Sequence, residues 1–496
     1  MKKILIMAIP VIATSMASGS VFAVDGFSYA GTETIDRLSG GSGYTTTSRI
    51  VSGADGGLYK SSFKSVRSGM DFDGSVAGVD VITTKGTHIT KHNLDGSYAW
   101  TFENATYSSV VNSDPSGNVY LAGSISGATD LDYTSGVDSH TSVGSKDAYV
   151  TKINADLSYG WSVTFGGIGS ESVYDVISNN QGDVYLTGTF SHVVDFDFGP
   201  GVDEHTSLLN PQYNGAVHSQ DLFVTKINND GSYAWTQVYG SEKNVHGSKL
   251  ALDSAGNVYV LGNTATTFGT SSKAIAILKF SSTGVADWSG EIGTENNLVA
   301  SDMAFSGDAV YVTGSFEKSV DFDPTSGVDI QSATAISAFS SYTNSFVTKV
   351  FTNGSYGWTK TFGGESTVYA NGVAVNSLGD VFVAGHYNNT ADFDPGLTTD
   401  LLVSVGGFDV FYAHFSTNGD YNGTTTIGWS ENDYAYDATM DQYGHFYHAG
   451  MVNHRIGSYP GVGDWDFDPG LGQDIRQVGS YGSGFFTKWE AYGACQ

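Results

Sequence analysis

The chain has 496 residues, including 64 glycines, 29 tyrosines and 28 phenylalanines, and only 15% of its residues are charged. This composition is typical of an all-β protein in which many short strands are joined by glycine turns. The formal net charge is −29, and so acidic a surface repels nucleic acid and anionic lipid. It suits divalent cations, cationic partners, or solubility alone. Cys495 is the only cysteine, which excludes an intrachain disulfide.

The first 23 residues have the pattern of a secretory signal peptide. Lys2 and Lys3 precede the apolar run ILIMAIPVIA, and Val21 and Ala23 occupy the small-residue positions before a cleavage site. The run is too short to cross a membrane, and no later stretch approaches the ~20 apolar residues that a spanning helix needs. We therefore expect a mature chain that begins near Val24, is secreted or periplasmic, and does not insert into a membrane.

One phrase recurs along the chain and defines a repeat. Its copies are a degraded GGLYKSS (56–62) followed by GNVYLAG (117–123), GDVYLTG (182–188), GNVYVLG (256–262), DAVYVTG (308–314), GDVFVAG (379–385) and GHFYHAG (444–450). A second phrase follows, as in SFVTKVFTNGSYGW (345–358), where apolar alternation predicts strand and the Asn-Gly pair predicts a tight hairpin. A third strand-and-turn phrase, such as NGVAVNSLG (371–379), precedes each copy.

Each repeat thus predicts four strands, and seven such repeats predict a seven-bladed β-propeller that spans residues 24–496 as one domain. A β-solenoid is the alternative. After GFFTKWEA (484–491) the last repeat lacks an outer strand, and VDGFSYAGTET (24–34) resembles the missing one. We expect this N-terminal strand to join the last blade and close the ring, which removes a free sheet edge.

The combination VYVTGSF…VDFDP…SFVTKV…GSYGWTKTFGG (310–364) resembles the bacterial seven-bladed β-propeller repeat family, abbreviated SBBP. The resemblance covers nearly all of the mature chain. It implies an extracytoplasmic propeller and no particular reaction, because propellers host many activities.

A cluster of aspartates recurs with the fixed spacing D-x-D-x5-D. Its copies are Asp130, Asp132 and Asp138; Asp195, Asp197 and Asp203; Asp321, Asp323 and Asp329; Asp392, Asp394 and Asp400; and Asp466, Asp468 and Asp474. Blade one has a variant one residue longer (Asp71, Asp73 and Asp80), and blade four has none. The length of the surrounding loop varies while the local spacing does not, which indicates a shared substructure.

Two interpretations of this motif are open. The first two carboxylates point to one face of a strand, and a turn could return the third beside them to form an oxygen cage for calcium. Alternatively, the side chains cap N–H groups of the loop or pair with lysines and fix the turn. We predict calcium as a cofactor on the first interpretation and none on the second.

The long connections follow the second and fourth strands of each repeat, which places them on one face of the disc. Binding residues usually lie on such loops. The candidates for contact with a ligand are His205, Tyr213, His218, Tyr342, Arg455, Tyr459 and Trp465, with His140 and His454 beside them. Packing within the long loops is the alternative role for each of them.

Catalytic motifs such as H-E-x-x-H, a P-loop or G-x-S-x-G before a helix are absent from the sequence. The carboxylate pairs belong to the repeated motif, and no unique pair is expected to stand apart from it. Trp100, Trp161, Trp235 and Trp358 recur with the repeat, which indicates blade packing, and His448 replaces a strand residue that is Val383 in the previous copy, which indicates a buried histidine.

Two functions remain open at this point. We favour an exported binding module, a monomer or weak oligomer that takes an extracellular protein or glycan on its loop face. The alternative is an extracellular hydrolase or lyase with a site at the central channel. An enzyme should carry one asymmetric polar cluster near the axis, whereas a binding scaffold should show equivalent blades.

Overall fold

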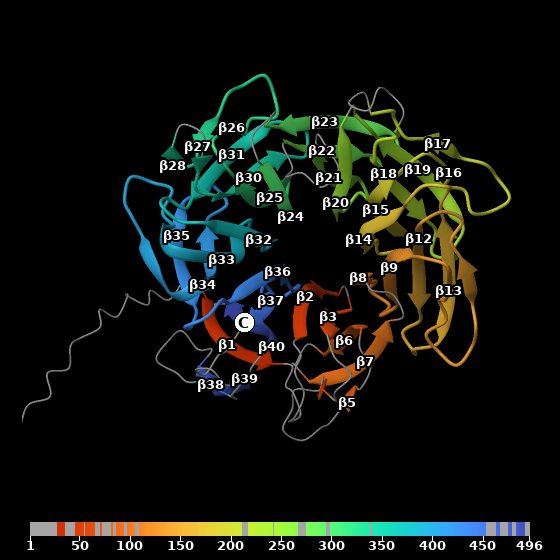
Figure 1. Ribbon diagram of the computed structural model, residues 1–496, viewed down its shortest axis with the longest axis horizontal. Coiled ribbons are helices and arrows are strands. Elements are labelled where there is room, and N and C mark those ends of the chain that lie inside the picture. Colours follow the sequence, from red (N-terminus) through yellow and green to blue (C-terminus); the bar gives the residue numbers. More distant parts are fainter. Residues whose placement is uncertain are drawn as a thin grey trace, which may run out of the picture.

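The computed structural model describes residues 27–491, apart from 35–44, 54, 65–69, 72–80, 83–85, 94–96, 105–108, 211–216, 242, 266–273, 294–297, 338–339, 453–462, 467–474 and 479–482. Within these residues, seven four-stranded antiparallel sheets surround a central axis as the blades of a propeller (Figure 1). The seven-bladed fold predicted from the repeat is confirmed. The predicted signal peptide, Tyr213, Arg455 and Tyr459 lie outside the described residues.

The blades are numbered one to seven in the order of their inner strands. The inner strands are β2 (Thr45–Ser52), β8 (Ser109–Ser113), β14 (Ser172–Ser178), β20 (Asn244–Leu252), β24 (Leu298–Ser306), β32 (Val368–Val375) and β36 (Tyr434–Met440). The second strands are β3 (Leu58–Lys64), β9 (Val119–Ile125), β15 (Val184–Phe190), β21 (Val258–Ala265), β25 (Ala309–Phe316), β33 (Val381–Asp392) and β37 (Phe446–Val452).

The third strands are β6 (Gly86–His92), β12 (Asp147–Ile153), β18 (Asp221–Ile227), β22 (Ala274–Phe280), β30 (Asn344–Phe351), β34 (Leu401–Phe415) and β40 (Ser483–Ala491). The outer strands are β7 (Tyr98–Asn104), β13 (Tyr159–Phe165), β19 (Tyr233–Tyr239), β23 (Ala286–Ile292), β31 (Tyr356–Phe362), β35 (Tyr421–Ile427) and, in blade seven, β1 (Phe27–Thr34). Middle strands are buried on both faces, which explains their nearly continuous apolar runs.

Blade seven combines the two ends of the chain. Strand β1 pairs antiparallel with β40, with Phe27 opposite Ala491 and Thr34 opposite Phe485. The N-terminal strand therefore occupies the outer position that the last repeat lacks, as expected. A cluster of Ile50, Leu58, Tyr447, Ala449 and Phe486 packs blade seven against blade one.

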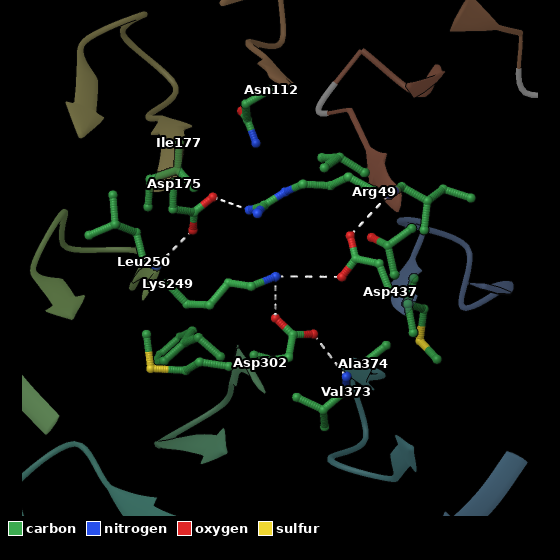
Figure 2. Close-up of a pocket in the computed structure, with 18 of the residues that line it drawn as sticks. Arg49, Asn112, Asp175, Ile177, Lys249, Leu250, Asp302, Val373, Ala374 and Asp437 are labelled. Atoms are coloured by element: carbon green, nitrogen blue, oxygen red, sulfur yellow. Dashed lines mark hydrogen bonds and ion pairs between the residues drawn. The ribbon is translucent and has the colours of Figure 1, made fainter. Parts of the chain in front are cut away.

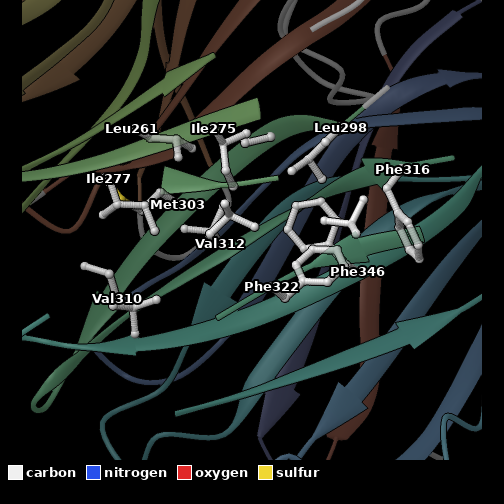
Figure 3. Close-up of a cluster of buried hydrophobic side chains, with 14 of the residues drawn as sticks. Leu261, Ile275, Ile277, Leu298, Met303, Val310, Val312, Phe316, Phe322 and Phe346 are labelled. Atoms are coloured by element: carbon white, nitrogen blue, oxygen red, sulfur yellow. The ribbon is translucent and has the colours of Figure 1, made fainter. Parts of the chain in front are cut away.

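The hydrophobic core is divided among the interfaces between neighbouring blades. Between blades four and five, for example, Leu261, Ile275 and Ile277 face Val312 and Phe346 (Figure 3). Burial of an aliphatic or aromatic side chain contributes about 1.5–3 kcal/mol. Each blade is thus stabilised mainly by its neighbours.

A repeated tryptophan joins the outer strands of blades two to five to the next blade. Trp235 Nε1 donates to Ser282 O at 3.3 Å, and Trp358 Nε1 donates to Thr417 O at 3.2 Å. The receiving turn carries a glycine with positive φ, such as Gly284 at 82°, and a Cβ added there would lie 2.7 Å from the Trp235 ring. The expected packing role of Trp161, Trp235 and Trp358 is confirmed by these contacts.

The connections between second and third strands contain short hairpins. They are β4 (Met70–Asp71) with β5 (Val81–Ile82), β10 (Ala128–Asp130) with β11 (Ser139–Thr141), β16 (Val193–Asp195) with β17 (Glu204–Thr206), β26 (Ser319–Asp321) with β27 (Ile330–Ser332), β28 (Ala335–Ser337) with β29 (Ser340–Ser341), and β38 (Gly463–Asp466) with β39 (Ile475–Val478). In blade six the hairpin is continuous with β33 and β34. The described part of the chain contains no helix long and apolar enough to cross a membrane.

Candidate functional site at the propeller axis

Five charged side chains from five blades meet at the axis of the ring (Figure 2). Each occupies the same position in its inner strand, directly after a β-bulge. They are Arg49 in blade one, Asp175 in blade three, Lys249 in blade four, Asp302 in blade five and Asp437 in blade seven. The corresponding residues are Val110 in blade two and Gly372 in blade six. This axial cluster therefore breaks the repeat symmetry of the scaffold.

The cations of the axial cluster form ion pairs with neighbouring and with more distant blades. Arg49 Nη2 forms an ion pair with Asp175 Oδ1, from blade one to blade three. Lys249 Nζ lies 2.8 Å from Asp302 Oδ1 and 3.5 Å from Asp437 Oδ1, which joins blade four to blades five and seven. In the order of the blades around the axis, each cation thus lies between two carboxylates.

Each carboxylate of the cluster also joins two adjacent blades through a backbone amide. Asp175 Oδ2 accepts the Leu250 N–H at 2.8 Å, Asp302 Oδ2 accepts the Val373 N–H at 2.9 Å, and Asp437 Oδ2 accepts the Ile50 N–H at 3.0 Å. These bonds connect blades three and four, five and six, and seven and one. The cluster is therefore held rigidly, as a preorganised site requires.

Burial shifts the ionisation of the cluster. It raises the pKa of Asp302, and the Asp437 charge adds to the rise while Lys249 opposes it. Burial alone would lower the pKa of Lys249 and of Arg49, but the surrounding carboxylates outweigh it and raise both pKa values. Both cations therefore stay charged, and Asp302 accepts a proton more readily than an ordinary carboxyl.

The cluster lines a cavity of about 260 Å³ on the axis. Asn112 adds a further polar group, and Met303, Phe305 and Thr439 complete much of the wall. A second cavity of about 310 Å³ lies among the starts of inner strands β14, β20 and β24, lined by Tyr174, His246, Gly247, Ser248, Asn263, Ala265 and Val299. The starts of inner strands and the ends of second strands lie on the face that carries the long connections.

Tyr174 lines the second cavity and contacts Arg49, which lines the first. Its backbone carbonyl accepts a hydrogen bond from Arg49 Nη1 at 3.4 Å, and Asp175 follows it in the chain. Its ring is 39% exposed and stacks on His246 at 6.4 Å with an interplanar angle of 14°. Burial lowers the pKa of His246, so this ring is neutral at neutral pH. We call the second cavity, with Tyr174 and His246 at its border, the mouth of the axis. It presents an accessible aromatic face beside polar groups.

The expectation that no unique pair of carboxylates stands apart from the repeated motif is wrong, since Asp302 and Asp437 share Lys249 as a partner. Asp175, Asp302 and Asp437 belong to inner strands and have no part in D-x-D-x5-D. A signal was available in the sequence, because Arg49, Asp175, Lys249 and Asp437 each precede a turn glycine by the same interval that places Gly372 before Gly379. This position does not appear as a repeated motif, because its residue type changes from blade to blade.

In the repeated aspartate motif, the first carboxylate closes the hairpin. Asp321 Oδ1 accepts the N–H groups of Asp323 at 3.2 Å and Asp329 at 2.8 Å. The same pair of bonds occurs at the first aspartate of the other copies that the structure describes, which are Asp130, Asp195 and Asp392. These bonds match the loop-capping interpretation.

The second and third carboxylates also have protein partners. Asp323 Oδ1 accepts from the N–H and the hydroxyl of Thr325, and Asp329 Oδ2 accepts from the Tyr356 hydroxyl. Tyr159, Tyr233 and Tyr421 donate in the same way to Asp138, Asp203 and Asp400. Blade four, which lacks the motif, has Ala286 at the tyrosine position. The motif and the outer-strand tyrosine therefore form one unit.

Calcium binding by these loops stays a prediction. Among the described residues, no group of three or more His, Cys, Asp or Glu side chains is arranged to hold a metal ion. In the fifth copy Asp466 ends β38, whereas Asp468 and Asp474 lie outside the described residues. In the four described copies, the carboxylate oxygens that could bind calcium accept hydrogen bonds from protein groups.

The loop-face candidates that the structure describes do not gather into one site. His205 Nε2 lies 3.2 Å from Asp203 Oδ1 and His140 Nε2 lies 3.0 Å from Asp138 Oδ2, so both histidines support the motif of their own blade. His218 Nδ1 contacts Ser207 O at 2.9 Å. Tyr342 is partly buried, and its N–H donates to Thr334 O at 2.9 Å. Trp465 lies in β38 opposite Arg476. The expected buried role of His448 is confirmed, since it is fully buried and contacts the Tyr412 hydroxyl at 2.5 Å.

Comparison with known proteins does not identify the function of this chain. No protein-family model matches the chain, and no curated protein matches it. A solved structure of a protein of unknown function from Dyadobacter fermentans aligns with 94% of this chain and 100% of its own, at 10% identity and a TM-score of 0.38. A glucose dehydrogenase aligns over 69% of this chain and 92% of its own, at 9% identity and a TM-score of 0.30. A puromycin hydrolase aligns over 83% of this chain and 59% of its own, at 11% identity and a TM-score of 0.33. At these values none of them bears on the activity of this chain, which is a seven-bladed β-propeller.

Proposed function

We propose that this protein is an exported propeller that binds a saccharide at the mouth of its axis. The observation that carries the proposal is the asymmetric arrangement at the mouth, where Tyr174 and His246 border a cavity of about 310 Å³ next to the axial cluster. Ligand pockets in proteins are typically about 300–1,000 Å³ and combine aromatic walls with a few fixed polar groups. The signal-peptide pattern of residues 1–23 supports export.

The chemistry of the mouth matches a sugar ring. The exposed face of Tyr174 offers apolar contact to the C–H face of a pyranose, while Ser248 and the polar groups of the axis offer hydrogen bonds to its hydroxyls. Tyr436 occupies in β36 the bulge position that Tyr174 occupies in β14 and adds a further aromatic group at this level. The Arg49 contact fixes the position of Tyr174 relative to the charged floor.

We propose in addition that the chain belongs to the bacterial seven-bladed β-propeller repeat family. The support is the recurrence of the VYVTG, FVTK and GSYGW phrases along the chain, together with the seven four-stranded blades into which they fold. Membership of this family would explain the scaffold. The choice of ligand would then depend on the residues at the mouth of the axis.

A saccharide array tests the binding function. The wild-type chain should bind a defined subset of saccharides, and Tyr174→Ala should lose that binding. The control is Tyr443→Ala, since Tyr443 is also exposed but lies in the turn between β36 and β37, which is on the opposite face. Absence of binding by the wild type, or equal binding by Tyr174→Ala, would refute the proposal.

Cleavage of the bound saccharide, by hydrolysis or elimination, is a second candidate function. The observation that favours it is the raised pKa of Asp302, since a carboxyl that stays protonated is a general acid. Each axial carboxylate also accepts a backbone amide, however, which commits one oxygen of each to blade packing. Mass spectrometry of the saccharides that bind would detect cleavage, and Asp302→Asn should abolish it while binding persists.

A further inference from the structure

The hairpin of blade six carries an exposed apolar stripe that the hairpins of blades two, three and five lack. Leu401, Val403 and Val405 of β34 are 59%, 64% and 74% exposed, and Leu397 at the hairpin tip is fully exposed. The side chains alternate along the strand, so the three face the same side. At the same register the other described blades have Ser139, Thr141 and Val143; Glu204, Thr206 and Leu208; and Ile330, Ser332 and Thr334. Single exposed apolar residues are ordinary, but among the hairpins whose exposure the structure describes a continuous row occurs in blade six alone.

This stripe lies on a strand that has a free edge. On one side Leu401–Val403 pair with Thr390–Asp392 of β33. On the other side the sheet neighbour of β34 is β35, whose pairing covers only Val410–Phe415. Within the described residues no strand pairs with 401–405 on that side. The open edge ends at Val405, whose N–H donates to Asp409 Oδ2 at 2.8 Å. Proteins usually protect such edges with lysine, proline or a bulge, and the segment LLVSVGGF (401–408) has neither charge nor proline.

The sector of the chain that contains this edge is strongly acidic. From residue 361 to residue 454 the sequence has no Lys or Arg, whereas it has Glu365, Asp380, Asp392, Asp394, Asp400, Asp409, Asp420, Glu431, Asp433, Asp437 and Asp441. This stretch contains all of β32 to β37, which are blade six and half of blade seven (Figure 1). A second copy of the chain would bring two such sectors together, which like charges oppose. A basic partner is attracted by the same field.

We propose that the free edge of β34 binds an extended segment of a basic partner protein by strand addition. The partner segment would be apolar at alternate positions, where it packs on Leu401, Val403 and Val405, and would carry Lys or Arg at its ends, where it faces the acidic sector. Main-chain hydrogen bonds supply affinity in this binding mode and alternate side chains supply specificity. The site lies on the long-loop face but is separate from the axial mouth.

A labelled peptide tests the proposal on the full chain. The probe is a synthetic peptide of about ten residues that alternates Val and Thr between flanking lysines, and the readout is fluorescence anisotropy. The wild type should bind it saturably, and Val403→Lys and the uncharged Val403→Ser should each weaken binding by about tenfold or more. The matched control is Ile330→Lys, because Ile330 is 61% exposed and occupies in blade five the position of Leu401. It should bind as the wild type does, as should Tyr174→Ala.

Three results would overturn the proposal. The first is absence of saturable binding to the wild type, checked against a peptide in which glutamate replaces lysine. The second is an equal loss in Ile330→Lys, which would mean diffuse attraction by the acidic chain. The third is sedimentation of the wild type as a dimer that Val403→Lys dissociates, which would assign the edge to a second copy. Circular dichroism of each variant verifies folding.

Discussion

Replacement of Lys249 by methionine is the most informative perturbation of the axial cluster. Lys249 Nζ contacts Asp302 Oδ1 at 2.8 Å and Asp437 Oδ1 at 3.5 Å, and both carboxylates are buried. Methionine retains the volume and removes the charge. Asp302 and Asp437 would then keep only their backbone donors, Val373 and Ile50. Removing one partner of a buried ion pair costs about 3–5 kcal/mol, which is a large part of the ~5–15 kcal/mol that stabilises a typical domain.

The loss should depend on pH. Lys249 opposes the rise in the Asp302 pKa, so its removal should raise that pKa further. A carboxyl whose pKa is higher in the folded than in the unfolded state binds a proton more tightly when folded. The destabilisation should therefore be small below the ordinary carboxyl pKa of 3.8 and should grow as pH rises through the folded value.

Urea unfolding followed by tryptophan fluorescence at pH 5 and pH 8 measures both effects. The control is Lys226→Met, since Lys226 contacts only the partly exposed Asp183 at 2.8 Å in the ion pairs that the structure describes. Such a pair near the surface contributes about 0–1 kcal/mol. Equal losses in the two variants, or a Lys249→Met loss that does not change with pH, would refute the account of the axial cluster.

Four further outcomes follow from the same contacts. Gly284→Ala should destabilise by about 1–2 kcal/mol more than Gly307→Ala in thermal melts, because both glycines have positive φ but only at Gly284 does a Cβ meet Trp235; equal losses would contradict the packing role of that tryptophan. Tyr356→Phe should cost about 1–2 kcal/mol by leaving Asp329 with one donor fewer, and an unchanged melt would show that the hydroxyl bond does not hold the hairpin. Burial raises the pKa of Glu171 to about 7, so stability should fall as pH rises from 4.5 to 7, and Glu171→Gln should flatten this slope; a slope that persists in the variant would point to another group. EDTA should leave the melting temperature unchanged if the aspartate loops are held by their own hydrogen bonds, whereas a rise that calcium but not magnesium produces, and that Asp321→Asn with Asp323→Asn reduces, would establish the calcium site.

The fold could be predicted because the repeat acts locally. The VYLTG and FVTK phrases give middle strands that are buried on both faces. Turn glycines with positive φ, such as Gly182 and Gly231, give the hairpins that join these strands to the inner and outer strands. The pairing of β1 with β40 followed from the outer strand that the last repeat lacks.

The axial cluster could not be predicted from local sequence patterns in the same way. Arg49 and Asp175 lie 126 residues apart in sequence, and their pairing depends on the curvature of the ring rather than on local spacing. The repeated aspartates are evident in the sequence because they recur, whereas the residue type at the axial position varies among blades. Residues that recur in every blade indicate the scaffold, whereas a position that differs among blades indicates a candidate site.

Hydrogen–deuterium exchange with and without a saccharide selected on the array tests the central claim most directly. We predict that the ligand slows exchange at the starts of β14 and β20, around Tyr174 and His246, and leaves the β16–β17 and β26–β27 hairpins unchanged. Protection confined to those hairpins, with none at β14 or β20, would contradict a binding site at the mouth of the propeller axis.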